Sequence, residues 1–209
     1  IVVTIGGQSA TVTPLTQEEA GGVANAYAAT YTLTGTETSV APLTFTIDAE
    51  DLAGNTLTQV TAVTDTSSVA IDNDAPVLSS VSIISNNGKD TALAMAGDEI
   101  TISFTASSDI DPSTLAATIG GQVAAVAHVS GDDYTATYTV LGTEDPAIAQ
   151  GALAFTINGE DLAGNALVEV TSVTDGSEVV LDTEVPLLSD VMIESDNAKD
   201  TSLAIAGDT

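Results

Sequence analysis

The stretch Ile100-Thr101-Ile102-Ser103-Phe104-Thr105-Ala106 alternates apolar side chains with hydroxyl-bearing ones, and this alternation decides the fold class. Successive side chains of a β-strand point to opposite faces, so a period of two indicates a strand with one buried and one solvated face. The same pattern returns in Tyr134–Val140 and in Leu153–Ile157. Threonine on the solvated side suits a pleated surface and adds no charge. We therefore predict an all-β fold.

Working outward from this stretch, the sequence predicts about seven strands between residues 77 and 182. Gly120-Gly121 lies between two short apolar runs and predicts a tight hairpin. Asp175-Gly176 also suits a hairpin, but we interpret it as a bulge or sheet switch within one long final strand. Gln17–Tyr27 is the one place where a short helical turn is expected. Frequent short strands of this kind are typical of an immunoglobulin-like sandwich. The expected strands cover residues 77–85, 99–106, 114–120, 122–128, 134–140, 152–158 and 167–182.

Several blocks of the sequence occur twice at nearly the same spacing. Glu50–Asn55 (EDLAGN) returns 110 residues later as Glu160–Asn165, and Asn87–Thr91 returns at the same spacing as Asn197–Thr201. A third block, TIGGQ beginning at Thr4, returns 114 residues later, which indicates small loop insertions. A period near 110 is too long for one turn of a solenoid and matches an independent domain. We therefore predict tandem immunoglobulin-like β-sandwich repeats of about 110 residues.

The two ends of the chain are out of phase with this repeat. Residues 76–185 form one complete repeat, which we name the central unit. Residues 1–75, the first unit, correspond to the C-terminal part of a repeat, and residues 186–209, the C-terminal segment, correspond to the start of a further one. We interpret the chain as a window from a longer array, so Ile1 and Thr209 are not expected to be natural termini and no signal peptide is expected.

Composition excludes several functions. The 209 residues include 30 acidic ones and only two lysines, Lys89 and Lys199, which gives a net charge of −28. Such a charge repels phosphates and anionic lipid, so nucleic acid is not an expected partner. Membrane insertion is not expected either, because no apolar run reaches eighteen residues. The absence of cysteine excludes disulfides and thiolate zinc sites. A hydrophobic fraction of 44% is enough to fill a core.

Strand direction places the acidic loops at the two ends of the central unit. If its first strand runs away from the upstream linker, the loops after the second and sixth strands return to that linker. The residues expected to meet at this upstream junction are Asp72, Asn73, Asp74, Asp109, Asp111, Glu160 and Asp161.

The downstream junction should repeat the scheme, and the first unit should present two acids to a linker outside this chain. The residues concerned are Asp182 and Glu184 in the second linker, Asn87, Asp90 and Asp98 in the loop beside it, and Glu50 and Asp51 in the first unit.

Six carboxylates in one small volume repel each other strongly unless a cation lies among them. Calcium takes 6–8 oxygen ligands at flexible geometry, whereas magnesium keeps its waters and zinc prefers histidine or cysteine. We therefore predict Ca²⁺ at the junctions. The alternative is an ordinary solvated acidic surface, in which Pro112 simply sets a turn after Asp111. In the repeated EDLAGN loop, Asp161 is the expected metal ligand and Leu162 is expected to enter the core.

These motifs resemble two known families. Asp72–Pro76 (DNDAP) and Asp109–Asp111 (DID) are similar to the calcium-binding linker and the D-x-D loop of cadherin repeats. The DLAGN loop and the Asp-x-x-x-Pro linker, on units of about 110 residues, resemble the bacterial Ig-like repeats that form extender regions of giant secreted adhesins. The chain departs from these patterns in lacking a Leu-Asp-Arg-Glu element and in having Thr183 and Glu184 in its second linker. The resemblance implies a secreted, extracellular protein of the bacterial cell surface.

Three functional interpretations follow. The leading one is a structural extender segment of a repetitive bacterial adhesin or surface fibre, stiffened by calcium at its interdomain junctions, with neighbouring repeats of the same chain as partners. The second is a calcium-dependent, cadherin-like module that binds polysaccharide or pairs with like chains. The third is a filament in which residues 186–209 of one chain complete residues 1–75 of the next. The third is disfavoured because the strand equivalent to Ile100–Ala106 would still be missing.

An enzyme is not expected. His128 is the single histidine, and nucleophilic catalysis needs a base oriented beside a hydroxyl or thiol. Paired carboxylates can cleave glycosides, but an aromatic content of 3% provides little wall for a sugar site. The scarcity of lysine and arginine has two compatible interpretations: solubility from like charge in salty surroundings, and resistance to trypsin-like proteases.

Overall fold

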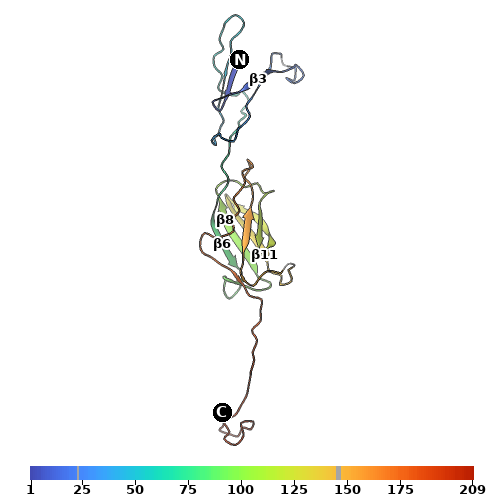
Figure 1. Ribbon diagram of the computed structural model, residues 1–209, viewed down its shortest axis with the longest axis vertical. Coiled ribbons are helices and arrows are strands. Elements are labelled where there is room, and N and C mark those ends of the chain that lie inside the picture. Colours follow the sequence, from blue (N-terminus) through green and yellow to red (C-terminus); the bar gives the residue numbers. More distant parts are fainter. Residues whose placement is uncertain (23, 145–146) are drawn as a thin grey trace.

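The fold is described from a computed structural model in which residues 1–22, 24–144 and 147–209 are described. No helix occurs among these residues, so the prediction of an all-β fold is confirmed. Nothing in this described part of the chain forms a helix with the length and apolarity needed to cross a bilayer. Figure 1 shows the first unit, the central unit and the C-terminal segment following one another along the long axis.

The first unit forms short strands in two small sheets. One sheet has the order β2-β1-β5, and the other pairs β3 with β4. The turn between β1 and β2 is Gly6-Gly7, and both glycines have positive φ angles, 59° and 78°. The strands are β1 (Val2–Ile5), β2 (Gln8–Ser9), β3 (Thr11–Pro14), β4 (Tyr27–Thr30) and β5 (Phe45–Asp48).

The central unit contains the longest strands, and the alternating stretches predicted them. Its described strands are β6 (Leu78–Ser85), β7 (Leu93–Ala94), β8 (Glu99–Ala106), β9 (Ala116–Ile119), β10 (Gln122–Ser130), β11 (Asp133–Thr139), β12 (Gly151–Ala152), β13 (Phe155–Asn158) and β14 (Val180–Leu181). They form a six-stranded sheet of order β13-β9-β10-β11-β8-β6 and a three-stranded sheet of order β12-β14-β7.

Strand β10 forms a corner of the central unit. Its first three residues pair with β9, and the residues from Ala125 onward pair with β11, with an irregularity between His128 and Ser130. The preceding hairpin turns at Gly120-Gly121 as predicted, because Gln122 pairs directly with Ile119. Both glycines adopt the positive φ that a two-residue hairpin turn requires.

One hydrophobic core fills the central unit. The apolar side chains of the alternating strands point into it, and Ile100, Ile102 and Phe104 are almost completely buried. The rings of Phe104 and Tyr134 stack with centroids 5.6 Å apart. The segment between β13 and β14 also contributes to this core through Leu167. Burial of this apolar surface is the main term that stabilises the unit.

The prediction of one long strand over 167–182 is wrong, although the chain does change sheets there. Val170 still forms a bridge to Ile157 beside β13. The chain then leaves that sheet, and the Thr174 N–H donates to the Val81 carbonyl over 2.8 Å. Only β14 is a strand, and it runs parallel to β7. Long-range bonds to β6, which no local pattern encodes, therefore interrupt the strand.

The helical turn expected at Gln17–Tyr27 is reduced to isolated turns. Thr16 and Glu19 bond each other reciprocally, and the Ala20 N–H donates to the Thr16 carbonyl over 3.0 Å. This is the start of a capped helical turn, but no helix follows among the described residues. Val23, within the expected turn, lies outside the described residues.

Candidate functional site

The linker between the two units, Asp72–Pro76, is hydrogen-bonded to the first unit through Asn73. Its side-chain amide donates to the Glu37 carbonyl over 2.6 Å, and its backbone N–H donates to Ser39 Oγ over 3.0 Å. Asn73, which the sequence placed among the metal candidates, therefore bonds the unit upstream of it. One end of the linker is fixed by these two bonds.

The same linker is also hydrogen-bonded to the central unit. The side-chain amide of Asn165 donates to the Asp72 carbonyl over 3.2 Å. Pro76 is buried, and Val77 exchanges two bonds with Ser107, one to its hydroxyl at 3.0 Å and one from its backbone at 2.9 Å. The linker is thus hydrogen-bonded at both of its ends, through Asp72 and Asn73 at its start and through Val77 directly after it.

The repeated EDLAGN loop is held together by its own aspartate. Asp161 is only 3% exposed and accepts the N–H groups of Ala163 and Asn165 together with the Asn165 side-chain amide, all within 2.9 Å. The Asn165 amide is the main cause that lowers the pKa of Asp161, followed by the backbone donors. The ionised carboxylate therefore closes the loop and orients Asn165 toward the linker.

The expectation that Leu162 enters the core is wrong. Its side chain is 71% exposed, and the equivalent Leu52 is fully exposed. The reason is geometric: the loop turns around the Asp161 carboxylate, which takes the buried position, so the next side chain points outward. In the first unit Asp51 makes the same three bonds with Ala53 and Asn55, and its pKa is likewise lowered, chiefly by the Asn55 amide.

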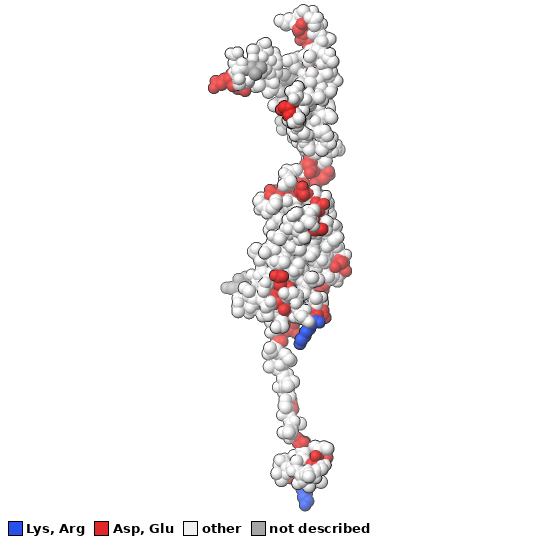
Figure 2. Space-filling model, turned by 180° about the vertical axis from the view of Figure 1, so that it is seen from behind, with Lys and Arg blue, Asp and Glu red and all other residues white. Residues whose placement is uncertain are grey.

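Two loops of the central unit lie side by side at the upstream junction. The Asp111 N–H donates to the Glu160 carbonyl over 2.8 Å, and Ile110 forms a bridge with Asp161. Because Asn165 in the second of these loops bonds Asp72, the linker and both loops meet. Figure 2 shows acidic side chains gathered at the narrow neck between the units.

The remaining upstream acids divide into two kinds. Asp72 accepts the Asp74 N–H, and Asp111 accepts both the N–H and the hydroxyl of Ser113, which lower the pKa of Asp111. Within the described part of the chain, the carboxylates of Asp74, Asp109 and Glu160 have no hydrogen-bond partner. The hydroxyl oxygen of Ser108, the residue before Asp109, is buried and also has no hydrogen-bond partner among the described residues. These are the oxygen atoms that remain available to a ligand.

The described residues contain no group of three or more histidine, aspartate or glutamate side chains close enough together to hold a metal ion. The donors at the upstream junction are all oxygen atoms, the kind that calcium prefers. The chemical type of these oxygen ligands therefore fits a hard cation. In the described structure, however, the acidic side chains do not lie close enough together to bind one. Calcium remains a prediction for this site.

The downstream junction shows a similar division. Asp98 accepts the Asn87 side-chain amide and the Met95 N–H over 2.7 and 2.9 Å, so it closes the loop before β8. Asp90 accepts the Ala92 N–H, and Asp182 accepts the Glu184 N–H, each within 3.0 Å. In the C-terminal segment Asn197 and Asp208 bond in the same way as Asn87 and Asp98. These loop acids act first as local caps.

The second linker is tied to the central unit by a different residue pair. Thr183, at the position of Asn73, exchanges two bonds with the Gln150 side chain, at 3.0 and 2.5 Å. The substitution of threonine for asparagine therefore keeps a linker bond. In the first unit, Glu50 is exposed and forms a backbone bridge with Thr56. Among the described residues, Glu50 and Asp51 are not part of any cluster of three or more possible metal ligands.

Sequence reasoning missed a tyrosine–glutamate corner that supports the linker. The Tyr31 hydroxyl donates to Glu37 Oε1 over 2.5 Å, and the Thr34, Gly35 and Thr36 N–H groups surround the same carboxylate. The Tyr31 hydroxyl is the first cause that lowers the pKa of Glu37 to about 2. The signal was present, because YTLTGTE, which ends at Glu37, returns as YTVLGTE, which ends at Glu144.

The corner matters for the junction because the backbone carbonyl of Glu37 accepts the amide of Asn73. In the central unit the Tyr138 hydroxyl donates to Glu144 over 3.2 Å, a longer bond in the same arrangement. No protein-family model, curated protein or solved structure matches this chain. The features of the chain that bear on its function are therefore the repetition of its sequence and the geometry of the linker.

Proposed function

We propose that this chain is part of a row of immunoglobulin-like β-sandwich repeats that acts as an extended spacer in an extracellular bacterial adhesin or surface fibre. The observation that carries the proposal is the linker, which is hydrogen-bonded to the unit before it through Asn73 and to the unit after it through Asn165. A five-residue connection without such bonds would be a hinge. A connection bonded on both sides transmits orientation from one unit to the next.

The strand pairing supports the immunoglobulin-like part of the proposal. The neighbours β6-β8-β11-β10 match one sheet of such a sandwich, and β9 with β13 and the Val170 bridge match the other. The parallel pairing of β14 with β7 joins the last strand to the N-terminal part of the unit. The repeated blocks of sequence extend this arrangement to residues on either side.

Calcium has a defined place in the proposal. Asp74, Asp109 and Glu160, with Asp72 and Asp111, would hold the ion, which would neutralise acids that have no internal counter-ion. The chain's own residues do the positioning: Asn165 and Asn73 fix the linker, and Asp161 fixes Asn165. The bacterial-surface setting comes from the family resemblance of the linker and the DLAGN loop and stays a prediction.

The aromatic side chains do not favour the binding-module alternative. Tyr134 is buried, and Tyr31 and Tyr138 are half-buried and bonded to glutamates. Only Tyr27 among the four tyrosines is exposed, which makes no platform for a polysaccharide within the described residues.

The proposal is tested by measuring the distance between the two units. Because the chain has no cysteine, Ser9→Cys and Ser130→Cys, both at exposed positions, place one spin label on each unit. We expect pulsed electron paramagnetic resonance to give a narrow distribution of distances between the two labels. Unlabelled protein is added in excess so that only distances within one chain are measured. Asn165→Ala removes a bond to the linker worth about 1 kcal/mol and should broaden the distribution. The matched control is Asn55→Ala, which removes the equivalent side-chain bond to the aspartate of its own loop but no bond to a linker. A broad distribution in the unmodified chain would overturn the rigid spacer.

The calcium part is tested in the same labelled protein. The distance distribution should be narrower in calcium than in chelator. The bound ion would neutralise the junction carboxylates, whose mutual repulsion salt screens only beyond about 8 Å. Titration calorimetry should show calcium uptake, and Asp74→Asn combined with Asp109→Asn should abolish it. Equal distributions with and without calcium, and no heat of binding, would reject calcium and leave the hydrogen-bonded linker standing.

A further inference from the structure

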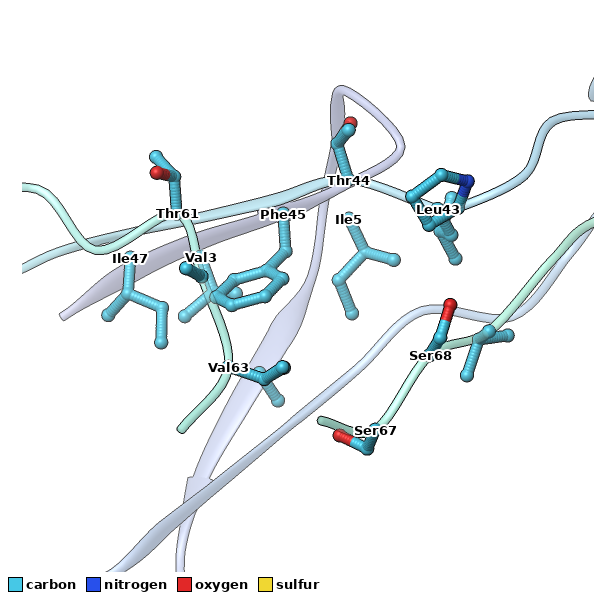
Figure 3. A pocket seen from close by; sticks show the side chains of 14 residues that line it. Val3, Ile5, Leu43, Thr44, Phe45, Ile47, Thr61, Val63, Ser67 and Ser68 are labelled. Carbon is cyan, nitrogen blue, oxygen red and sulfur yellow. The ribbon is translucent and has the colours of Figure 1, made fainter. Parts of the chain in front are cut away.

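The first unit has an open apolar groove that offers no reactive side chain. It encloses about 560 Å³, and its described lining consists of hydrocarbon and hydroxyl groups without a carboxylate, an amide or an amine. Figure 3 shows Val3, Phe45 and Ile47 on one side, with Ser67 and Ser68 on a separate segment across the opening. Reactive groups of another kind lie outside this groove, where asparagine is followed by glycine.

Two asparagines of the chain precede a glycine, Asn87 and Asn158. At such a pair the backbone nitrogen of the glycine can attack the asparagine Cγ, because glycine has no side chain to hinder the approach. The Cγ–Nδ2 bond breaks, ammonia leaves with the proton of the glycine nitrogen, and a cyclic imide remains. Water then opens the imide to aspartate or, by addition at the main-chain carbonyl, to isoaspartate. Both asparagines have the sequence that this reaction favours.

The structure distinguishes the two by the freedom of the glycine. Asn158 is the last residue of β13 and is paired with β9. The Gly159 carbonyl accepts the Leu167 N–H over 2.9 Å, and a Cβ on Gly159 would lie 3.3 Å from Ile110 Cγ2. Gly88 is exposed, and a Cβ on it would have nothing within 4 Å. Of the two glycines, Gly88 is the one whose backbone has room to move toward the preceding side chain.

The side chain of Asn87 is also held in a polarising environment. Its Oδ1 accepts the backbone N–H groups of Lys89 and Asp90 at 3.0 and 3.4 Å, and its Nδ2 donates to Asp98 Oδ2 over 2.7 Å. Negative charge develops on Oδ1 when the glycine nitrogen attacks Cγ, and the two N–H groups stabilise it there. The loop therefore supports the attack at the atom where charge accumulates.

Asn197 in the C-terminal segment is the matched case without glycine. It makes the same three hydrogen bonds within its own loop as Asn87 does. The residue after it is Ala198, whose side chain hinders the attack. The chain thus contains a loop asparagine before glycine, a loop asparagine before alanine and a strand asparagine before glycine.

Conversion of Asn87 would act on β7, which lies in the same loop. An aspartate at this position loses the donor to Asp98 and places two carboxylates side by side, where they repel each other. The segment between them contains β7, and its carbonyl groups accept the N–H groups of Val180 and Asp182 over 2.9 Å. A loop that opens therefore loosens the pairing of β7 with β14, the strand that leads into the downstream linker.

We propose that Asn87 is a site of spontaneous deamidation in the folded chain, and that its conversion to aspartate or isoaspartate releases the loop that holds β7 against β14. Water is the co-reactant and ammonia the product. The released ammonia is not recaptured, so the strand pair weakens with the age of the protein and does not recover. Neither calcium nor the spacer function enters this step.

The site is tested by incubating the full chain in chelator at mildly alkaline pH. Trypsin then cleaves after Lys89 and Lys199, which places Asn87 and Asn158 in different peptides, and fragmentation in the mass spectrometer locates each conversion of amide to acid. Asn87 should convert roughly tenfold faster than Asn158 and Asn197, or more. In urea, where β13 is unfolded, Asn158 should convert as fast as Asn87, while Asn197 stays slow.

Gly88→Ala is the matched variant, because it gives Asn87 the neighbour that Asn197 has. Gly88 has open space around it and does not have a positive φ, so alanine fits there without strain. The variant should slow conversion of Asn87 roughly tenfold or more. Equal rates at Asn87 and Asn158 in the folded chain, an Asn87 that converts only in urea, or no effect of Gly88→Ala would each overturn the proposal.

The consequence is tested with Asn87→Asp, which reproduces the aspartate product. Hydrogen exchange of the Val180 and Asp182 N–H groups should become about fivefold faster, the effect of one lost hydrogen bond. Asn197→Asp is the control, because it makes the same chemical change in the C-terminal segment, and it should leave both exchange rates unchanged. Equal exchange in Asn87→Asp and in the unmodified chain would overturn the link between Asn87 and β7.

Discussion

Two regions of the molecule, the first unit and the central unit, have closely similar sequences at matched positions but differ in burial. The described buried hydrophobic side chains of residues 1–75 are Val3 and Ile71, whereas the central unit has a cluster that includes Phe104, Ile119 and Ile157. The loops and turns are nevertheless the same: Asp51 and Asp161 close their loops with identical bonds, and both Gly-Gly turns have positive φ. Local structure therefore follows from local sequence, and the core requires the two strands β6 and β8 in addition.

The largest expected difference between the units is in the cost of a core truncation. Ile157→Ala removes a fully buried side chain and should destabilise the central unit by about 2–4 kcal/mol. Ile47→Ala, at the matched position in the open groove, should cost about 1 kcal/mol or less because its side chain is only half-buried. Urea unfolding followed by circular dichroism should resolve the two effects. Equal costs would mean that the first unit is packed as well as the central one.

A smaller difference is expected at the matched turn glycines. Gly6 and Gly120 have φ angles of 59° and 58°, so alanine is strained in both by about 1 kcal/mol. A Cβ on Gly120 would also lie 2.5 Å from Cγ2 of the buried Ile148, whereas a Cβ on Gly6 would lie 3.0 Å from Leu43 Cδ1. Gly120→Ala should therefore cost about 2–3 kcal/mol and Gly6→Ala about 1 kcal/mol in thermal unfolding. A larger loss for Gly6→Ala would contradict the looser packing of the first unit.

The smallest difference concerns acid titration of the two tyrosine–glutamate corners. Hydrogen bonds, first from the Tyr31 hydroxyl and then from Thr34, lower the pKa of Glu37 from 4.5 to about 2. For Glu144, burial raises the pKa, but backbone N–H groups, among them Leu141, and the Tyr138 hydroxyl outweigh it and leave the pKa lowered. A depressed carboxylate pKa stabilises the fold above the unfolded value, and this contribution is lost as the pH falls from 4.5 toward 2.

Carboxyl titration by NMR checks this assignment. Glu37 should titrate near pH 2, and Tyr31→Phe should raise its pKa markedly. Tyr138→Phe, the matched change in the central unit, should raise the pKa of Glu144 less, because its bond is longer, 3.2 Å against 2.5 Å. A Glu37 carboxyl that titrates at its ordinary value in the unmodified chain would show that the corner is open in solution.

The elements predicted from sequence are those that depend on neighbours along the chain. Alternation identified β8 and β11, and the glycine pair identified the hairpin at Gly120. The segment after Val170 could not be read in this way, because its path is set by Thr174 and Ser177 bonding β6 more than ninety residues away. Local sequence carries no information about such a register.

The sequence predicted which segments lie together at the candidate site, but it did not predict the hydrogen bonds that these segments make. Strand direction placed the linker beside the loops that contain Asp111 and Asp161, and bonds between these segments are present. Asp161 accepts N–H groups of its own loop, and Asn165, which was not among the predicted site residues, donates a hydrogen bond to the linker. The positions of acidic residues in the sequence do not show which carboxylates are already hydrogen-bonded, because most of the groups that donate to them are backbone N–H groups.

The parallel pairing of β14 with β7 has a mechanical consequence. The bonds from Val180 to Ala92 and from Asp182 to Ala94 lie across the pair, and β14 leads straight into the downstream linker. A pull on Asp182 toward the downstream linker is directed along β14, parallel to β7, so we expect it to load these two bonds together instead of opening them one at a time. In the proposed row of repeats, we therefore expect this strand pair to resist tension before the core of the central unit is exposed to water.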